Sequence, residues 1–367
     1  MNLEFWKNRN VFITGHTGFK GGWISLWLSR MGAKIYGYSL PPPTSINFFE
    51  LTKIEKLLSQ SLIGDILDFK SLNQAMKSAK PSVVIHMAAQ PLVKHSYAFP
   101  IDTFKTNIIG TANVLEAAKN TESVKAIINV TTDKCYENQE QKKPYTENDR
   151  LGGYDPYSSS KACAELISTA YQKSFFISSG VNLATVRAGN VIGGGDWSKD
   201  RLIPDFFRAL ETKETLQIRS PNATRPWQHV LEPISGYLML AEKLVHDGIN
   251  YSEPWNFGPD ESNTKSVSQI LEYLCKKIKG CNWSVKKKTQ LHETMFLNIN
   301  SSKAQSRLGW NHRWDLETAL NKTIDWYQVW LENEDLISIT NLQIDEYETT
   351  IKNHKLVNEA TRNKAQR

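Results

Sequence analysis

A tyrosine and a lysine four positions apart could act together as a base. Tyr157 and Lys161 stand at this spacing, and in a helix such residues lie one turn apart on the same face. A free phenol has a pKa of about 10, which is too high for a base near neutrality. An ammonium one turn away stabilises the phenolate and lowers that pKa. The spacing also arises by chance, so an incidental pair on a solvated helix is the alternative.

Three more side chains able to do chemistry follow a strand-like segment upstream. Residues 126–131 have the pattern of a buried strand, and Thr132, Asp133 and Lys134 come directly after it. Open α/β sheets place their chemistry outside the carboxyl ends of their strands. We therefore expect these side chains to belong to the same site as Tyr157.

The element that should hold a cofactor begins the chain. Residues 11–14 have the pattern of a short buried strand, residues 23–30 carry apolar residues at helical spacing, and Gly15, Gly18 and Gly21 lie between them. Glycine permits the tight turn and lets the backbone approach a pyrophosphate, which then rests on the amino end of the helix. Strand, G-x-x-G-x-x-G and helix together predict a dinucleotide site; a plain glycine-rich turn is the alternative.

The second strand ends without the expected acid. In Rossmann sites that bind NAD, an Asp or Glu at this point usually binds the ribose hydroxyls. Here residues 34–38 are followed by Ser39, and no arginine stands ready for the 2′-phosphate of NADP. We therefore expect NAD, with Ser39 on a ribose hydroxyl. Asp65 ends a third strand-like segment and is expected to accept a hydrogen bond from the adenine amino group. The alternative is that Asp65 caps the helix that begins at Phe69.

Small residues follow the next strand. Residues 82–87 should be fully buried, and Ala88, Ala89 and Gln90 come after them, where small side chains let a dinucleotide lie close. The polar Asn107 lies within a predicted long helix over residues 102–119. It is either a satisfied core residue or an anchor for the catalytic strand.

Composition narrows the class of protein. The chain has 367 residues, 40% hydrophobic and 22% charged, with a formal net charge of +6. That is typical of a globular protein of one or two domains, and no basic stripe suggests nucleic acid. No apolar run is long enough to span a bilayer, and the polar amino terminus predicts no signal peptide. The four cysteines lack metal-ligand spacing, so we expect no metal and free thiols in a reducing cytoplasm.

Five motifs together resemble a known family. The chain resembles the extended short-chain dehydrogenase/reductases that modify nucleotide sugars, and within them the CDP-glucose 4,6-dehydratases. The resemblance runs from about residue 5 to about residue 330. It is carried by TGHTGFKGGW at 14–23, DKCYEN at 133–138, GGYDPYSSSK at 152–161, RAGNVIGGGDW at 187–197 and RPWQH at 225–229.

The resemblance implies an α/β fold, with a Rossmann-type doubly wound parallel sheet and a smaller, discontinuous α/β substrate-binding cap. The Rossmann domain would comprise residues 1–189 and 229–259, the cap 190–228 and 260–335, and residues 336–367 would form a tail of unknown role. The resemblance also implies a homodimer, which would pair helices near 102–119 and 158–173.

The reaction that the resemblance implies is an internal redox cycle. NAD would oxidise CDP-glucose at C4, water would leave across C5 and C6, and the hydride would return to C6. The product, CDP-4-keto-6-deoxy-D-glucose, would serve the synthesis of dideoxyhexoses in surface polysaccharides. Because NAD is regenerated, it would behave as a tightly held cofactor.

The resemblance also gives each catalytic residue a role. Tyr157 would take the C4 hydroxyl proton, Lys161 would hold the phenolate and the nicotinamide ribose, and Thr132 would bond the C4 oxygen. Asp133 would protonate the departing C6 hydroxyl. Most related dehydratases pair this Asp with a Glu, whereas Lys134 stands here as a base or enolate stabiliser. An ion pair between Lys134 and Asp133 is the alternative.

Two sets of binding residues complete the expectation. The cofactor set is Gly15, Thr17, Gly18, Phe19, Lys20, Gly21, Ser39, Asp65, Ile66, Ala88, Ala89, Gln90, Asn107, Tyr157 and Lys161. The substrate set is Asn190, Arg201, Leu202, Arg219 and Arg225. The arginines are chosen because the guanidinium fork matches diphosphate oxygens.

Other residues of the carboxyl-terminal half are not assigned to either binding set. The glycine-rich residues 193–197 are expected to be a flexible loop that could form a lid. Trp227 either stacks on cytosine or is buried between domains, and His229 is expected to be structural. His292 and Glu293 are weaker candidates for the diphosphate.

Two other functions remain open from the sequence. A C4 or C2 epimerase of the same fold would keep Tyr157 and Lys161 but would not need an acid for C6, so Asp133 argues against it. A non-catalytic NAD sensor would tend to lose the tyrosine or the lysine, and both are present.

Overall fold

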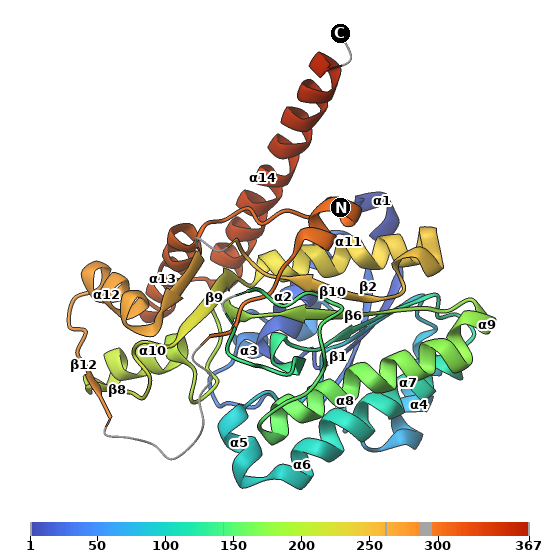
Figure 1. Cartoon of the computed structure of the whole chain (residues 1–367), viewed down its shortest axis with the longest axis horizontal. Coiled ribbons are helices and arrows are strands. Elements are labelled where there is room, and N and C mark those ends of the chain that lie inside the picture. The colour runs from blue at the N-terminus through green and yellow to red at the C-terminus, as the bar shows by residue number, and fades with distance from the viewer. Residues whose placement is uncertain (1, 142, 261–262, 287–295, 366–367) are drawn as a thin grey trace.

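A seven-stranded parallel sheet runs through the centre of the molecule (Figure 1). The computed structural model describes residues 2–141, 143–260, 263–286 and 296–365, with side chains as far as residue 350. In sheet order the strands are β10 (Pro254–Phe257), β6 (Asn182–Ala188), β5 (Ala126–Val130), β4 (Val83–His86), β1 (Asn10–Thr14), β2 (Lys34–Ser39) and β3 (Gln60–Ile63).

The strand order reverses between β1 and β4. From β1 the chain proceeds outward to β2 and β3, and then returns to lay β4, β5, β6 and β10 on the other side. Every residue of β4 and β5 is buried, as expected for parallel strands covered on both faces. This confirms the doubly wound Rossmann-type sheet, and its reversal point is where such folds bind ligands.

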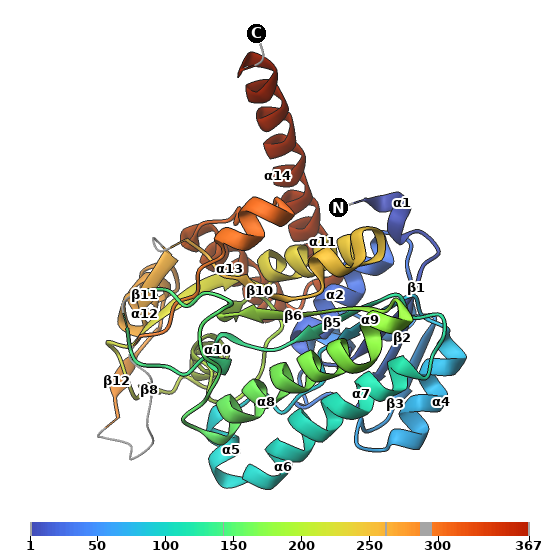
Figure 2. The same ribbon diagram turned by 45° about the vertical axis from the view of Figure 1, so that its right-hand side comes forward.

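Helices cover both faces of this sheet (Figures 1 and 2). One face carries α2 (Phe19–Arg30) and α11 (Leu231–Asp247), and the other carries α4 (Phe69–Ala79), α7 (Gly110–Lys119) and α8 (Pro156–Tyr171). The shorter helices are α1 (Leu3–Trp6), α3 (Phe48–Leu51), α5 (Val93–Ala98), α6 (Pro100–Phe104) and α9 (Ile177–Ser179). The π-helical turns Lys105–Ile109 and Gln172–Phe176 join α6 to α7 and α8 to α9, so both predicted long helices are present.

Two small sheets lie beside the carboxyl ends of the main strands. One consists of β11 (Thr264–Ser266), β9 (Thr224–His229) and β7 (Asn190–Ile192), and the other of β12 (Trp283–Val285) and β8 (Leu216–Ile218). They are accompanied by α10 (Leu202–Thr212), α12 (Val267–Lys277) and α13 (Leu316–Leu331). We keep the division into a Rossmann domain and a discontinuous cap as a proposal that fits these segments.

The tail packs on the body through the start of its helix. Helix α14 (Leu336–Ala365) buries Leu336, Ile344 and Tyr347. The Trp27 indole on α2 donates to Glu348 Oε1 at 2.7 Å, and Arg30 pairs with Asp345. Farther along, the helix extends away from the body (Figures 1 and 2).

The expectation of four free thiols is wrong for two of them. Cys275 and Cys281 form a disulfide, with their Cα atoms 5.2 Å apart, whereas Cys135 and Cys163 are free. Helix α12 ends at Lys277, and the chain turns back at Gly280, where φ is +85°. That turn brings Cys281 beside the helix end.

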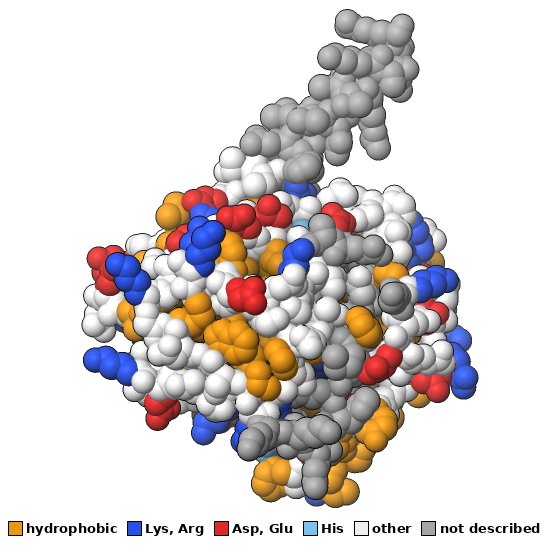
Figure 3. Space-filling model, turned by 60° about the vertical axis from the view of Figure 1, so that its left-hand side comes forward, with side chains coloured by type: hydrophobic (Ala, Val, Ile, Leu, Met, Phe, Trp, Pro, Cys, Tyr) orange, Lys and Arg blue, Asp and Glu red, His pale blue; other side chains and the backbone are white. Residues whose placement is uncertain are grey.

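Surface features agree with a globular protein. On the face in Figure 3, described side chains of both charge signs are scattered around small apolar patches. Within the described residues, no helix is both long and apolar enough to cross a membrane. The same residues hold no cluster of three or more His, Cys, Asp or Glu able to bind a metal ion.

Candidate active site

A large cleft follows the carboxyl ends of the central strands. Its volume is about 1550 Å³, which exceeds the roughly 300–1,000 Å³ of a site for one small ligand. All but two of the predicted site residues line it; the exceptions are Gln90 and Asn107. The cleft therefore has room for a dinucleotide and a second nucleotide side by side.

The glycine turn at one end of the cleft fits a dinucleotide. A Cβ at Gly21 would lie 2.0 Å from Gly15 O, and one at Gly15 would lie 2.7 Å from Ala88 N. Only glycine allows these backbones to meet. Helix α2 has no side-chain cap, so its first N–H groups face outward for a pyrophosphate. The observed turn fits NAD, as predicted.

Ser39 and Asp65 line the cleft, but both have partners in the protein. Thr17 Oγ1 lies 2.8 Å from Ser39 Oγ and donates to Leu40 O at 2.9 Å. Asp65 Oδ1 accepts from Leu67 N at 2.9 Å. The alternative that Asp65 caps the helix from Phe69 is wrong, because Asp68 is the cap and accepts from Ser71 N.

Gln90 and Asn107 stand behind the cleft wall. Gln90 N donates to Asn107 Oδ1 at 2.9 Å, and Asn107 Nδ2 donates to Gln90 O at 3.0 Å and to Ser160 Oγ at 2.8 Å. Asn107 thus ties the segment after β4 to helix α8. It is an anchor, although for that segment rather than for the catalytic strand.

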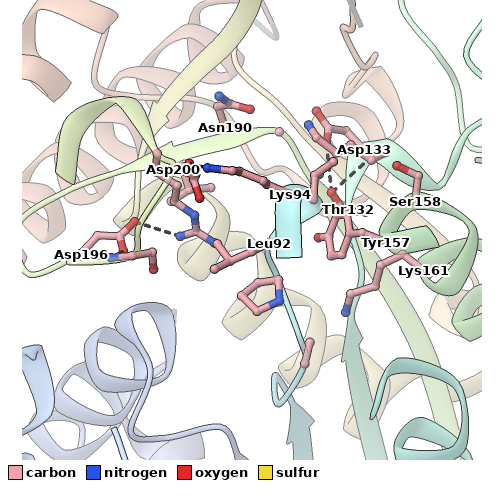
Figure 4. Close-up of a pocket in the computed structure, with 18 of the residues that line it drawn as sticks. Leu92, Lys94, Thr132, Asp133, Tyr157, Ser158, Lys161, Asn190, Asp196 and Asp200 are labelled. Atoms are coloured by element: carbon pink, nitrogen blue, oxygen red, sulfur yellow. Dashed lines mark hydrogen bonds and ion pairs between the residues drawn. The ribbon is translucent and has the colours of Figure 1, made fainter. Parts of the chain in front are cut away.

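Thr132, Asp133 and Lys134 lie together after β5, and Figure 4 shows the first two beside Tyr157. Asp133 is 1% exposed, and Thr132 Oγ1 donates to its Oδ1 at 3.0 Å. Lys134 Nζ lies 3.8 Å from the same Oδ1, so the alternative ion pair is present in the structure. The other oxygen, Oδ2, has no partner among the described residues. A buried carboxyl oxygen of this kind is available to a ligand.

Tyr157 and Lys161 lie on the first two turns of α8. The helix begins at Pro156 because the Asp155 side chain caps it and proline is favoured in a first turn. Both side chains are buried, at 7% and 6% exposure. Lys161 Nζ donates to Val130 O at 3.1 Å, which ties the helix to the end of β5.

The expected lowering of the Tyr157 pKa is wrong for this structure. Burial raises the pKa of Tyr157 to about 12, outweighing a hydrogen bond from Thr132 and the charge of Arg201. Burial also lowers the pKa of Lys161 to about 8, against the opposing charge of Glu165. Desolvation of the buried phenolate outweighs the cations around it, and the Lys161 ammonium is bonded to a carbonyl instead.

The opposite wall of the cleft carries the substrate candidates. Arg201 Nη1 pairs with Asp196 Oδ2 at 2.9 Å, and burial of Lys20 beside Arg201 and Lys161 lowers the Lys20 pKa to about 8. Asn190, Leu202, Arg219 and Arg225 line the same wall. Cations thus converge from both walls, as binding of two diphosphates requires.

One ion pair that sequence reasoning missed bridges the two walls. Lys94 on α5 reaches across the cleft (Figure 4), and its Nζ lies 2.8 Å from Asp200 Oδ1. Helix α5 is itself tied to the catalytic helix, because Tyr157 N donates to Ser96 Oγ at 3.1 Å. No motif marks either residue of the pair, so only the fold reveals it.

The glycine-rich loop is not a flexible lid. Trp23 Nε1 donates to Gly194 O at 2.9 Å, and Tyr327 OH donates to Asp196 O at 2.5 Å. A Cβ at Gly194 would lie 2.0 Å from the Trp326 ring, and one at Gly195 would lie 2.3 Å from Phe48. The glycines are there because aromatic rings occupy the space of their side chains.

The remaining candidates are buried or outside the described residues. Trp227 is 4% exposed and donates to Lys265 O at 3.1 Å, although it borders the cleft. His229 is fully buried, and burial lowers its pKa to about 3, which agrees with a structural histidine. His292 and Glu293 lie outside the described residues.

Comparison with known proteins shows similarity over nearly the whole chain. The family model for GDP-mannose 4,6 dehydratase matches residues 12–323. The CDP-glucose 4,6-dehydratase of Salmonella typhimurium is 47% identical over 344 residues, which cover 92% of this chain and 95% of that protein. A probable dTDP-glucose 4,6-dehydratase of Sinorhizobium fredii is 24% identical over 88% of this chain and 93% of that protein.

Two solved structures illustrate the similarity of fold. A UDP-glucose 4-epimerase of Thermotoga maritima with UDP-glucose has a TM-score of 0.75 and 22% identity, covering 88% of this chain and 99% of that one. A dTDP-glucose 4,6-dehydratase of Bacillus anthracis in complex with NAD has a TM-score of 0.73 and 23% identity, covering 90% and 99%.

Proposed function

The chain belongs to the GDP-mannose 4,6-dehydratase family, and from that premise we propose that it is an NAD-dependent hydro-lyase that converts CDP-D-glucose to CDP-4-keto-6-deoxy-D-glucose and water. The specific substrate is supported by the relative at 47% identity, which the chain matches along 95% of its length. The observation that carries the chemistry is the buried Asp133, with one unpartnered oxygen, in the same cleft as Tyr157.

The first half of the reaction needs a base at the C4 hydroxyl. Tyr157 takes this proton, and the Thr132 hydroxyl bonds the same oxygen. The glycine turn at Gly15, Gly18 and Gly21 would hold NAD, which would supply the acceptor for the C4 hydride and the source of the hydride for C6. The hydrogen bond from Thr132 and the charge of Arg201 favour the phenolate against the effect of its burial.

The second half needs an acid at the C6 hydroxyl. Once C4 is a ketone, the C5 proton becomes acidic, and its removal expels the C6 oxygen as water. The pair whose Lys134 Nζ and Asp133 Oδ1 lie 3.8 Å apart acts after the proton has passed from the ammonium to the carboxylate. Asp133 then delivers this proton to the C6 oxygen, and the neutral Lys134 amine takes the C5 proton or stabilises the enolate by a hydrogen bond.

A C4 epimerase is the second candidate, because such an enzyme shares this fold at a TM-score of 0.75. An epimerase keeps the C6 hydroxyl and needs no acid there. The buried, partly unpartnered Asp133 therefore favours the dehydratase.

The test is incubation of the purified protein with NAD and CDP-glucose in D2O, followed by mass spectrometry and NMR of the product. A 4-keto-6-deoxy sugar with deuterium at C5 is expected. UDP-, dTDP- and GDP-glucose run in parallel; turnover of one of them alone would replace the cytidine assignment. An epimerised sugar, or bound NAD with no turnover of any of the four, would overturn the dehydratase.

We also propose a homodimer. Three apolar side chains on the two predicted pairing helices are more than half exposed: Ile101, Ile109 and Leu166. Ile101→Asp with Leu166→Asp should reduce the mass measured by light scattering to that of one chain, 41.8 kDa. A parent protein of that mass would contradict the dimer. The cytoplasmic location expected from the sequence stays a prediction.

A further inference from the structure

We propose that the buried ion pair between Glu165 and Arg187 positions the catalytic groups, by fixing helix α8 against the strand end that carries Thr132 and Asp133. Neither residue lines the cleft. The inference rests on the proposed dehydratase activity. It names the pair that holds the helix with Tyr157 and the segment with Asp133 at a fixed distance and orientation.

The Glu165 carboxylate is fully bonded. Its Oε1 accepts from Thr131 Oγ1 at 2.5 Å and from Arg187 Nε at 2.9 Å. Its Oε2 accepts from Thr185 Oγ1 at 2.6 Å and from Arg187 Nη2 at 2.8 Å. Glu165 and Arg187 are each 1% exposed, so no water competes for these bonds, and the fork geometry fixes direction as well as distance.

These bonds join two catalytic segments. Glu165 lies four residues after Lys161 on α8, one turn along the same face. Thr131 immediately precedes Thr132 after β5. One carboxylate therefore connects the helix with the base to the segment with the acid. A slide or rotation of α8 would break all of its bonds at once.

Arg187 continues the connection to the other side of Asp133. Its Nη1 donates to Tyr136 OH at 2.9 Å, and its guanidinium lies 4.9 Å from the centre of the Tyr136 ring. Tyr136 OH donates to Asn256 Oδ1 at 2.7 Å. Since Tyr136 directly follows the turn Asp133–Cys135, the pair holds the residues on both sides of Asp133.

The pair also keeps negative charge beneath Lys161. Burial raises the pKa of Glu165, but the charge of Arg187 and the hydrogen bonds outweigh it and hold that pKa below its usual range. The resulting carboxylate favours the charged Lys161.

Stability alone is a poor explanation for this pair. Replacing a buried ion pair with apolar side chains of similar volume is often neutral or stabilising. Apolar side chains would fill the same space, but they could not fix the Thr131 hydroxyl and the helix at defined distances.

The experiment removes the pair while keeping its volume. The double variant Glu165→Leu with Arg187→Met is compared with the parent. The substrate is whichever of CDP-, UDP-, dTDP- and GDP-glucose the parent dehydrates. We expect a melting temperature close to the parent's, affinities for NAD and substrate within about threefold, and kcat lower by at least about tenfold. Parental kcat in the folded double variant would overturn the proposal.

Two further variants keep the test decisive. Thr131→Val removes the bond between the carboxylate and the strand end, together with a longer bond of the same hydroxyl to Val186 O at 3.3 Å. It should lower kcat with little change in KM, and unchanged kcat would also overturn the proposal. Glu232→Gln is the control, because Glu232 is equally buried and accepts from Tyr347 OH and Trp314 N away from the cleft. It should lose stability with unchanged kcat, and an equal loss of kcat there would show that any buried carboxylate has this effect.

The substrate choice separates this proposal from the preceding one. If the parent accepts a nucleotide sugar other than CDP-glucose, the proposed substrate fails while this comparison still proceeds. If the parent accepts CDP-glucose and the variants keep its kcat, only the positioning role fails.

Discussion

Tyr157 is the proposed base, and burial alone would disable it. A pKa of about 12 leaves few phenolates near neutrality, so turnover depends on positive charge gathered around the ring. The charge of Arg201 already acts on this value, and a bound oxidised nicotinamide would add a further positive charge. The base therefore becomes effective only when the cleft is filled.

Tyr157→Phe should lower kcat by a factor of about 10² or more, because the C4 proton loses its acceptor. The dissociation constant of the sugar nucleotide, measured by calorimetry, should change little. Activity equal to the parent's would remove the base assignment.

Asp133→Asn should separate the two halves of the reaction. An amide cannot protonate the departing C6 hydroxyl, but it leaves Tyr157 in place. We expect substrate to reduce the bound cofactor once, visible as NADH absorbance, without release of water. Normal yields of the 6-deoxy product would assign the acid elsewhere.

Lys161→Met should stabilise the free enzyme while abolishing turnover. Burial lowers the Lys161 pKa from 10.5 to about 8, so the cost of its buried charge is present below about pH 8 and disappears as pH rises through 10.5. The gain in unfolding free energy should reach at most about 3 kcal/mol near pH 7 and vanish near pH 10.5. Urea unfolding at both pH values measures it.

The control for this measurement is Lys7→Met, whose side chain is exposed and should give no such gain. Equal destabilisation by Lys161→Met at both pH values would show that burying the Lys161 ammonium does not cost the folded state free energy.

At the scale of elements, the spacing of apolar residues in the sequence predicted the strands and helices. The strand before Gly15 and the helix after it carry their own signals, and Gly15 and Gly21 stand where backbones touch. The loop at 193–197 was misread, because glycine marks both flexibility and close packing. Here the rings of Trp326 and Phe48 fill the space beside the glycines and fix the loop. Both residues lie far from the loop in the chain, so the sequence did not reveal this packing.

Helix α14 offers a second example. Its docking was not predictable, because besides the neighbouring α13 it contacts α2 and α11, which lie far earlier in the chain. Tyr347 OH donates to the buried Glu232 Oε2 at 2.8 Å, which connects the tail helix to α11.

Tyr347→Phe should lower the unfolding free energy by about 1–3 kcal/mol, since it leaves one carboxylate oxygen of Glu232 without this donor. Leu342→Ala is the control, because Leu342 on the same helix is 52% exposed and should change stability little. Thermal unfolding of both variants makes the comparison. A tail that does not dock in solution would make the two variants equal.

At the scale of the whole molecule, the two walls of the cleft touch through Lys94 and Asp200. These side chains are 53% and 34% exposed, and an ion pair this accessible contributes about 0.2–1 kcal/mol. That energy is small enough for the contact to open and close readily. Neither residue could be recognised from the sequence, because the pair forms only when helix α5 meets the segment before α10.

Lys94→Asp should speed release of CDP-glucose by up to about fivefold, measured by stopped-flow tryptophan fluorescence. Adding Asp200→Lys should restore the parental rate. The same exchange in the exposed pair Lys243–Asp247, also 2.8 Å apart, is the control and should have no effect. An equal effect of the control exchange would assign the change to net charge alone.

The docking of α14 has a consequence for the order in which the protein is made. Trp27, on the helix proposed to present the pyrophosphate site, donates to Glu348 and packs against Tyr347. The ribosome synthesises these partners more than three hundred residues after Trp27. A nascent chain therefore keeps one side of its cofactor helix uncovered through most of translation. Its dinucleotide half can reach its final packing only when synthesis has passed the tail.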